Sequence, residues 1–157
     1  MKSCLRALVL VASLLVGVIS LRAQMPTKPT LNLEMAKKIA AKAAAEAVKN
    51  KWTMVIAIVD DGANLVYLEK IDGTQIGSID VAQKKAQTAS KFKRSTKVFE
   101  DRVAAGGAAT GLLTLGILPL EGGLPIVVND THIGAIGVSG GTSAQDGQVA
   151  AAALAGP

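Results

Sequence analysis

The sequence predicts one small α+β domain, in which about five strands form an antiparallel sheet flanked by helices. Two observations indicate this fold class. Apolar runs occur in pairs joined by short turns, which is typical of β-hairpins and therefore of antiparallel pairing. Alanine-rich segments with apolar residues at helical spacing lie between and around these pairs. Such helices must cover the faces of the sheet, because each element buries one apolar side against another.

Residues 1–23 are predicted to be a cleavable secretory signal peptide. A basic start is followed by the apolar run 7–21 and by small residues near Ala23, the order that a signal peptidase substrate shows. The alternative is an uncleaved membrane anchor, but a run of about 15 residues is short of the ~20 that span a bilayer as a helix. We expect cleavage after Ala23, export to the periplasm or the extracellular space, and no membrane span in the mature chain.

Part of the positive charge of the full sequence lies in the predicted signal peptide. Cleavage removes Lys2, Arg6 and Arg22, which lowers the formal charge from +5 to +2. The chain also has only four aromatic residues on which bases could stack. We therefore expect no binding to nucleic acid.

Packing alone must stabilise the mature domain. Cys4, the only cysteine, leaves with the signal, so no disulfide can form. The apolar residues are mostly small, and alanine-rich helices bury little area each. We expect copies of the chain to supply further burial by forming a homo-oligomer.

The first half of the domain is predicted as a leader, a helix and a hairpin. Residues 24–31 contain two prolines and are expected to be a flexible leader before a domain of residues 32–157. Asn32 is a good N-cap for a helix that ends near residue 50. The run 52–59 is continuous and apolar, as in a buried strand, and 65–69 returns as its partner after an Asp-Gly turn.

The second half is predicted as two helices, a further strand, a hairpin and a last helix. Ser78 caps a helix with an apolar alanine face, and a short helix follows over 96–104. We expect a Gly/Ala-rich loop at 106–111 and a short strand at 112–118. A second hairpin is predicted over 125–129 and 133–138. The last helix is expected to begin at Ser143, which forms its cap together with Asp146, and to end near Leu154.

The segment Gly137–Gly141 (GVSGG) fits the G-x-S-x-G pattern of hydrolase nucleophiles at a strand-to-helix junction. The match fails on its partners, because those enzymes place the histidine after the serine and here His132 precedes it. Two interpretations remain open. The segment either accepts an anion on its backbone N–H groups or only allows close packing. The residues of the possible anion loop are Ser139, Gly140, Gly141 and Ser143.

His132 is the only histidine, so zinc or copper sites built from several nitrogen ligands are not expected. One histidine is enough for an axial haem ligand. Its position in a predicted hairpin turn favours an ordinary exposed residue, and both interpretations stay open.

Residues 84–97 contain six lysines and arginines and no acidic residue. A solvated helix face explains this pattern. A rim that holds the carboxylates or phosphates of a ligand explains it as well, and Arg94 is then the best forked donor. The six residues are Lys84, Lys85, Lys91, Lys93, Arg94 and Lys97.

Several segments together resemble the GlcG/HbpS family, which includes the C-terminal domain of PduO-type proteins. Their order and spacing are specific in combination, and they cover nearly the whole mature chain. They are VIAIVDDGANLVYL (55–68), KIDGTQIGSIDVAQKKAQTA (70–89), FKRST (92–96) and GGLPIVVNDTHIGAIGVSGG (122–141), followed by Asp146 and the last alanine-rich helix.

The resemblance implies a five-stranded antiparallel sheet with flanking helices, somewhat like profilin or PAS domains, in homo-oligomers that are often octameric. It also implies binding of haem or a related tetrapyrrole. Some exported members are linked to haem degradation, iron handling or redox sensing. Others, encoded with glycolate or propanediol metabolism, have no settled activity. Whether this chain is an enzyme stays open, and the resemblance names no catalytic residue.

The resemblance also suggests a site. In some relatives a threonine after the second helix lies at the haem iron, and Thr96 in FKRST is its match. In others a first-helix histidine binds iron, but residues 33–50 contain none. The leading hypothesis places haem against Phe92, with Lys91 and Arg94 at its propionates and Thr96, or failing that His132, at the iron. The alternatives are an accessory enzyme or binding module for a small carboxylate, and a purely structural assembly module.

Overall fold

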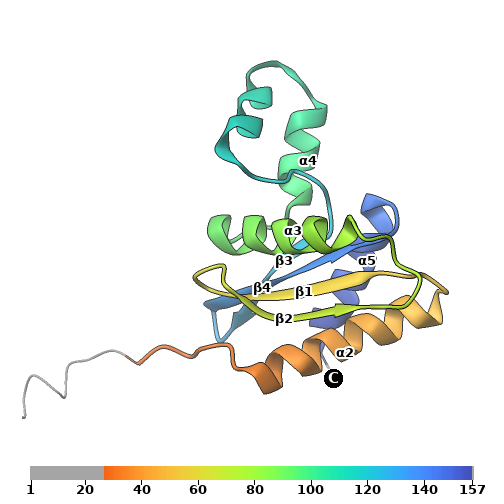
Figure 1. Ribbon diagram of the computed structural model, residues 1–157. Helices are drawn as coiled ribbons and strands as arrows, with labels where there is room; N and C mark the ends of the chain where they lie inside the picture. Colours follow the sequence, from red (N-terminus) through yellow and green to blue (C-terminus); the bar gives the residue numbers. More distant parts are fainter. Residues whose placement is uncertain (1–26, 157) are drawn as a thin grey trace, which may run out of the picture.

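The structure, a computed structural model, describes residues 27–156 and has three layers (Figure 1). A four-stranded antiparallel sheet in the order β2-β1-β4-β3 forms the middle layer. Helix α3 covers one face, and helices α2 and α5 cover the other. The predicted fold class is confirmed, with four strands instead of five.

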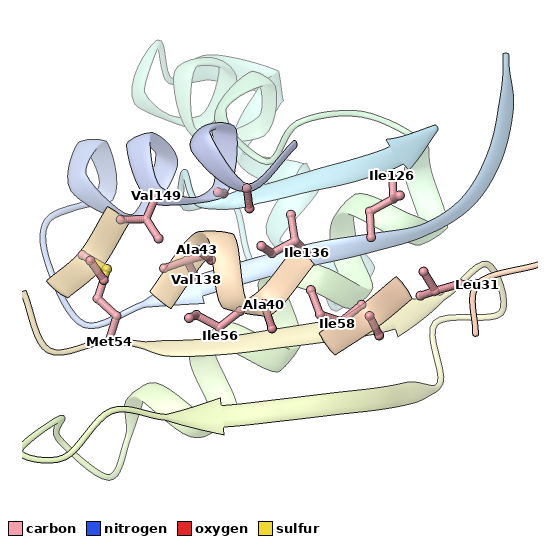
Figure 2. Close-up of a cluster of buried hydrophobic side chains, with 14 of the residues drawn as sticks. Leu31, Ala40, Ala43, Met54, Ile56, Ile58, Ile126, Ile136, Val138 and Val149 are labelled. Carbon is pink, nitrogen blue, oxygen red and sulfur yellow. The ribbon is translucent and has the colours of Figure 1, made fainter. Parts of the chain in front are cut away.

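Strand β1 (Val55–Asp60) is central because both of its faces are apolar. Successive side chains of a strand point to opposite faces. Ile56 and Ile58 therefore join the core beneath α2 and α5, which Figure 2 shows, whereas Val55, Ala57 and Val59 pack against α3. The partner β2 (Leu65–Lys70) forms the predicted first hairpin with it.

Helix α2 (Leu33–Lys49) begins as predicted at Asn32, whose side-chain oxygen accepts a hydrogen bond of 2.8 Å from the backbone N of Met35. A stripe of small side chains faces the sheet and lets the helix approach it closely. The stripe consists of Ala36, Ala40, Ala43 and Ala47, all fully buried.

Helix α3 (Ser78–Phe92) packs even more closely on strand β4 (Thr131–Ser139). A Cβ atom at Gly137 would lie 2.0 Å from the carbonyl oxygen of Ala82 and 2.5 Å from the backbone N of Ala86. Only glycine fits this contact, so α3 lies against the sheet backbone. The N-cap of α3 is Gly77, not Ser78 as predicted, and Ser78 is the first helical residue.

The predicted strand at 112–118 is wrong. Helix α4 (Lys97–Ala104) is followed by a 3-10 helix, η1 (Gly107–Leu115), which also replaces the predicted loop. Hydrogen bonds within the segment stabilise this turn structure, because the Thr110 and Thr114 hydroxyls donate to carbonyl oxygens three residues earlier. α4 and η1 stand away from the sheet on the side of α3 (Figure 1). No residue of η1 is buried.

The second hairpin is confirmed. Strand β3 (Gly123–Val128) joins β4 through Asn129 and Asp130, whose φ angles of 47° and 59° suit a two-residue hairpin turn. Helix α5 (Ser143–Leu154) is also confirmed, but its cap is not the predicted Ser143 with Asp146. Thr142 and Gln145 form the capping box instead.

The beginning of the domain differs in detail from the prediction. The predicted signal peptide, residues 1–23, lies outside the described residues. Of the predicted leader, residues 27–30 have no regular structure, but Leu31 is buried in the core (Figure 2). The Lys28 ammonium also forms an ion pair with Asp61. Within residues 27–156, no helix is long and apolar enough to cross a membrane.

Candidate functional site

The end of α3 brings together three of the predicted site residues. Lys93 adopts the left-handed conformation, with φ 51° and ψ 42°, and ends the helix. The following Arg94 turns back, donates from Nε to the carbonyl oxygen of Phe92 over 3.2 Å and lies with its guanidinium carbon 5.9 Å from the ring centre of Phe99. Lys91, one residue before Phe92, is exposed at the same corner.

Phe99 is a member of this corner that the sequence analysis did not assign. Its ring meets that of Phe92 edge to face, with centroids 5.3 Å apart and planes at 72°. Phe99 is buried, whereas Phe92 is only partly covered. The corner is therefore an aromatic pair with an exposed guanidinium held over it, and the pair orients Arg94 without any ligand.

Thr96 lies beneath this surface. Its side chain is fully buried, and its hydroxyl oxygen accepts a hydrogen bond of 2.9 Å from the backbone N of Gly123. The backbone N of Thr96 donates in return to the Gly123 carbonyl over 3.0 Å. A Cβ at Gly123 would lie 2.6 Å from the Thr96 methyl carbon, so glycine is required here. Thr96 ties the start of α4 to β3, and a ligand reaches its hydroxyl only if this contact opens.

A pocket lies between α3 and the end of η1, next to the corner. Lys84, Gln87, Thr88, Lys91 and Phe92 line one side, and residues 115–117 line the other. Its volume is about 40 Å³. Pockets that enclose drug-sized ligands hold about 300–1,000 Å³, so this one admits a single small group and not a macrocycle.

Lys85 is not part of the exposed basic rim. Its side chain is 2% exposed, and its Nζ donates to the Asp146 carboxylate over 2.6 Å and to the Val138 carbonyl over 3.1 Å. Asp146 also accepts from the backbone N of Gly141 over 3.0 Å. Burial raises the pKa of the Asp146 carboxyl above its ordinary value, and the Lys85 ammonium offsets only part of this.

Two backbone donors in the segment of the possible anion loop are used internally. The backbone N of Gly141 donates to Asp146, and that of Thr142 donates to the Gln145 side chain over 2.9 Å. An anion would therefore have to compete with these two side chains for the backbone donors of Gly141 and Thr142. Ser139 is buried in β4, seven residues or about 23 Å of strand from His132. The two therefore cannot form a nucleophile–base pair.

His132 lies at the start of β4 near the end of α3. It is partly buried, with Nε2 at 3.5 Å from the Ser90 hydroxyl oxygen. Burial, and then the Lys93 ammonium, lower the pKa of His132, so its ring is neutral at pH 7. His132 pairs with Val127, four residues or about 13 Å along β3 from the Gly123 that contacts Thr96.

Thr96 and His132 are therefore alternatives for one iron and cannot bind it together. In the described part of the chain, no group of three or more His, Cys, Asp or Glu side chains could hold a metal ion.

Comparisons with known proteins agree on one family. The family model described as haem degrading protein HbpS-like matches residues 31–155. Protein GlcG of Escherichia coli is 45% identical over 116 residues, which are 73% of this chain and 85% of that protein.

Two solved structures share the fold at similar levels. A double mutant of HbpS from Streptomyces reticuli has a TM-score of 0.75 at 31% identity and covers 83% of this chain and 89% of its own. A complex of PduOC with haem has a TM-score of 0.75 at 26% identity and covers 80% of this chain and 94% of its own.

Proposed function

Because the chain belongs to the HbpS-like family, we propose that it is a haem-binding protein. The haem complex of its relative PduOC supports this proposal. The observation that carries it in this chain is the exposed corner at the end of α3, where Arg94 lies over the Phe92–Phe99 pair and Lys91 lies beside them. A haem is a flat apolar ring with two carboxylates at one edge, and this corner offers both kinds of contact.

In this proposal the haem rests on the surface of the domain. The pocket of about 40 Å³ is too small to enclose it. The ring would contact Phe92 and the apolar end of η1, while Lys91 and Arg94 meet the propionates. Arg94 suits this role best, since its planar fork matches a carboxylate and its position is fixed in advance.

Two residues, Thr96 and His132, are candidates for the iron ligand. For Thr96 to lie at the iron, its hydrogen bond with Gly123 would have to open, and a hydroxyl is a weak ligand even then. For His132 to serve, its neutral ring would have to leave the Ser90 hydroxyl, and the haem would lie further toward the hairpin. We propose Thr96 first, because it lies next to Lys91, Phe92 and Arg94 in the chain.

The test is a haem titration of the purified protein, followed by the Soret band. Arg94→Ala is expected to weaken binding more than His132→Ala, because the propionate contact is the larger contribution. Arg102→Ala, which removes an exposed arginine of α4, is the matched control and should change nothing. The reverse ranking would move the site to the hairpin, and equal loss in Arg94→Ala and Arg102→Ala would show a non-specific charge effect.

The proposal extends to export and assembly. Residues 1–23 would direct the chain to the periplasm or beyond, and N-terminal sequencing of the mature protein should then begin after Ala23. Other exposed apolar side chains, such as Val48 and Ile76, would be covered when copies assemble, up to an octamer. Light scattering that gives the mass of one chain at micromolar concentration would contradict assembly.

A further inference from the structure

We infer that the pocket between α3 and the end of η1 is a binding site for one carboxylate group. The carboxylate belongs either to a haem propionate or to a free monocarboxylic acid. The first case rests on the proposed function and adds a second anchor to it, at Lys84, about two helical turns from the corner residues. The second case stands without haem.

The charge of the pocket carries the inference. Lys84 and Lys91 are seven residues apart, so they lie on one side of α3 about 10.5 Å apart along its axis. Neither forms a salt bridge with any residue that the structure describes. Two ammonium groups without an ion-pair partner in the described residues, at the wall of one pocket, favour an anion between them.

The size of the pocket selects the anion. A pocket of about 40 Å³ is far below the volume of sites that enclose whole small molecules, so it suits a single carboxylate and not a phosphorylated sugar or a ring. Gln87 lies between the two lysines on the same side of α3 and adds an amide donor. Phe92, Leu115 and Ile117 form the apolar part of the wall and reduce the contact of a bound anion with water, which strengthens its attraction to the lysines.

The pocket has a fixed width. The Thr88 hydroxyl donates to the Lys84 carbonyl over 2.8 Å and accepts from the backbone N of Leu118 over 3.0 Å. This bridge holds the chain that leaves η1 against α3. At Gly116 the φ angle of 66° ends η1 and allows the chain to turn toward the bridge without a side chain in the opening.

The surroundings favour a propionate. Leu115, which lines the pocket, and Leu113, two residues earlier, are 56% and 53% exposed, on a helix in which no residue is buried. A free acid would use only the pocket. A porphyrin with one propionate in the pocket could also cover these leucines, and we therefore expect it to bind more tightly than acetate.

The experiment compares Lys84→Gln with Lys37→Gln, an exposed lysine of α2 on the opposite face of the sheet. Each protein is titrated with haem and with haem dimethyl ester, in which both propionates are blocked. Each is also titrated with sodium acetate while the amide NMR signals of residues 115–117 are followed. Both lysines are exposed, and unchanged far-UV circular dichroism confirms that the variants fold.

If a propionate occupies the pocket, Lys84→Gln weakens haem binding about fivefold and leaves binding of the ester unchanged, while Lys37→Gln changes neither. If a free acid is the ligand, acetate shifts the signals of residues 115–117 in a saturable way, and only Lys84→Gln abolishes this. Haem and acetate results that are the same for both variants overturn the inference. A wild-type protein that binds no haem overturns the proposed function alone, because the acetate titration still tests the pocket.

Discussion

The buried pair of Lys85 and Asp146 should dominate the response of this fold to mutation. We consider Asp146→Asn, which keeps an oxygen that can accept from the backbone N of Gly141 but removes the negative charge. The Lys85 ammonium, 2% exposed, would then lie in the interior with only the Val138 carbonyl and a neutral amide as partners. The paired variant is Lys85→Met, and the double variant carries both changes.

The magnitude follows from the burial of both partners. Breaking a buried ion pair by removing one partner costs about 3–5 kcal/mol, because an uncompensated charge stays behind. Domains of this size have free energies of unfolding of about 5–15 kcal/mol, so Asp146→Asn should remove a large fraction. At roughly 3–5 °C per kcal/mol, the Tm should fall by about 9–25 °C. The double variant leaves no buried charge and should be more stable than the sum of the single losses predicts, by about 1–3 kcal/mol.

The stability of Lys85→Met should depend on pH differently from that of wild type. Burial already raises the pKa of Asp146 in the folded protein, and loss of the ammonium raises it further. A group whose pKa is raised on folding contributes stability below its unfolded pKa, near 4, and loses it as the pH rises through the folded value. The free energy of unfolding of Lys85→Met should therefore fall further below that of wild type as the pH rises from 4 to 7.

Urea denaturation followed by circular dichroism measures all four proteins at pH 4, 5.5 and 7. A loss below about 1 kcal/mol for Asp146→Asn would refute the reasoning, as would strictly additive losses in the double variant. A deficit of Lys85→Met that stays constant with pH would show that Asp146 does not change its protonation in this range.

Three further predictions concern packing, protonation and the buried threonine. Gly137→Ala should lower the free energy of unfolding, measured by urea denaturation, by about 3 kcal/mol or more, because the new Cβ would lie 2.0 Å from the Ala82 carbonyl oxygen. The control Gly111→Ala, with no atom within 4 Å of its Cβ, should leave the stability unchanged. Since the pKa of His132 is lowered on folding, wild type should lose stability as the pH falls below about 6.5, and His132→Gln should lack that part of the loss. Thr96→Val leaves the first backbone N–H of β3 unsatisfied and should lower the free energy of unfolding by about 1–3 kcal/mol. Thr96→Ser keeps the hydroxyl and should be close to wild type. Equal stability of all three proteins would contradict the role of Thr96 in tying α4 to β3.

Most of the fold was predictable because its signals are local. The helix that begins at Asn32 has its cap and its alanine face in the sequence, and both hairpins have their turn residues there. The segment 112–118 was not predictable in this way. Its run of leucine and threonine is compatible with a strand, but it pairs with neither edge of the sheet. Hydrogen bonds from its threonine hydroxyls to carbonyl oxygens three residues earlier hold it in η1 instead.

The site was predictable in part. The cluster of basic residues indicated the corner, and the structure brings Phe92 and Arg94 together there around Phe99. Lys85 was assigned to the same exposed cluster and is instead buried. Its position gave a usable signal, because it follows Ala82 by three residues and precedes Ala89 by four, which places it on the apolar face of α3. Its partner Asp146 could not be found from spacing, since the fold brings the two together across 61 residues.

The measurement that tests the haem proposal most directly is an absorption titration of the purified wild-type chain with haem. We expect a Soret band displaced from that of free haem, which grows and saturates at a fixed ratio of haem to chain. A spectrum that stays that of free haem at every ratio would contradict it.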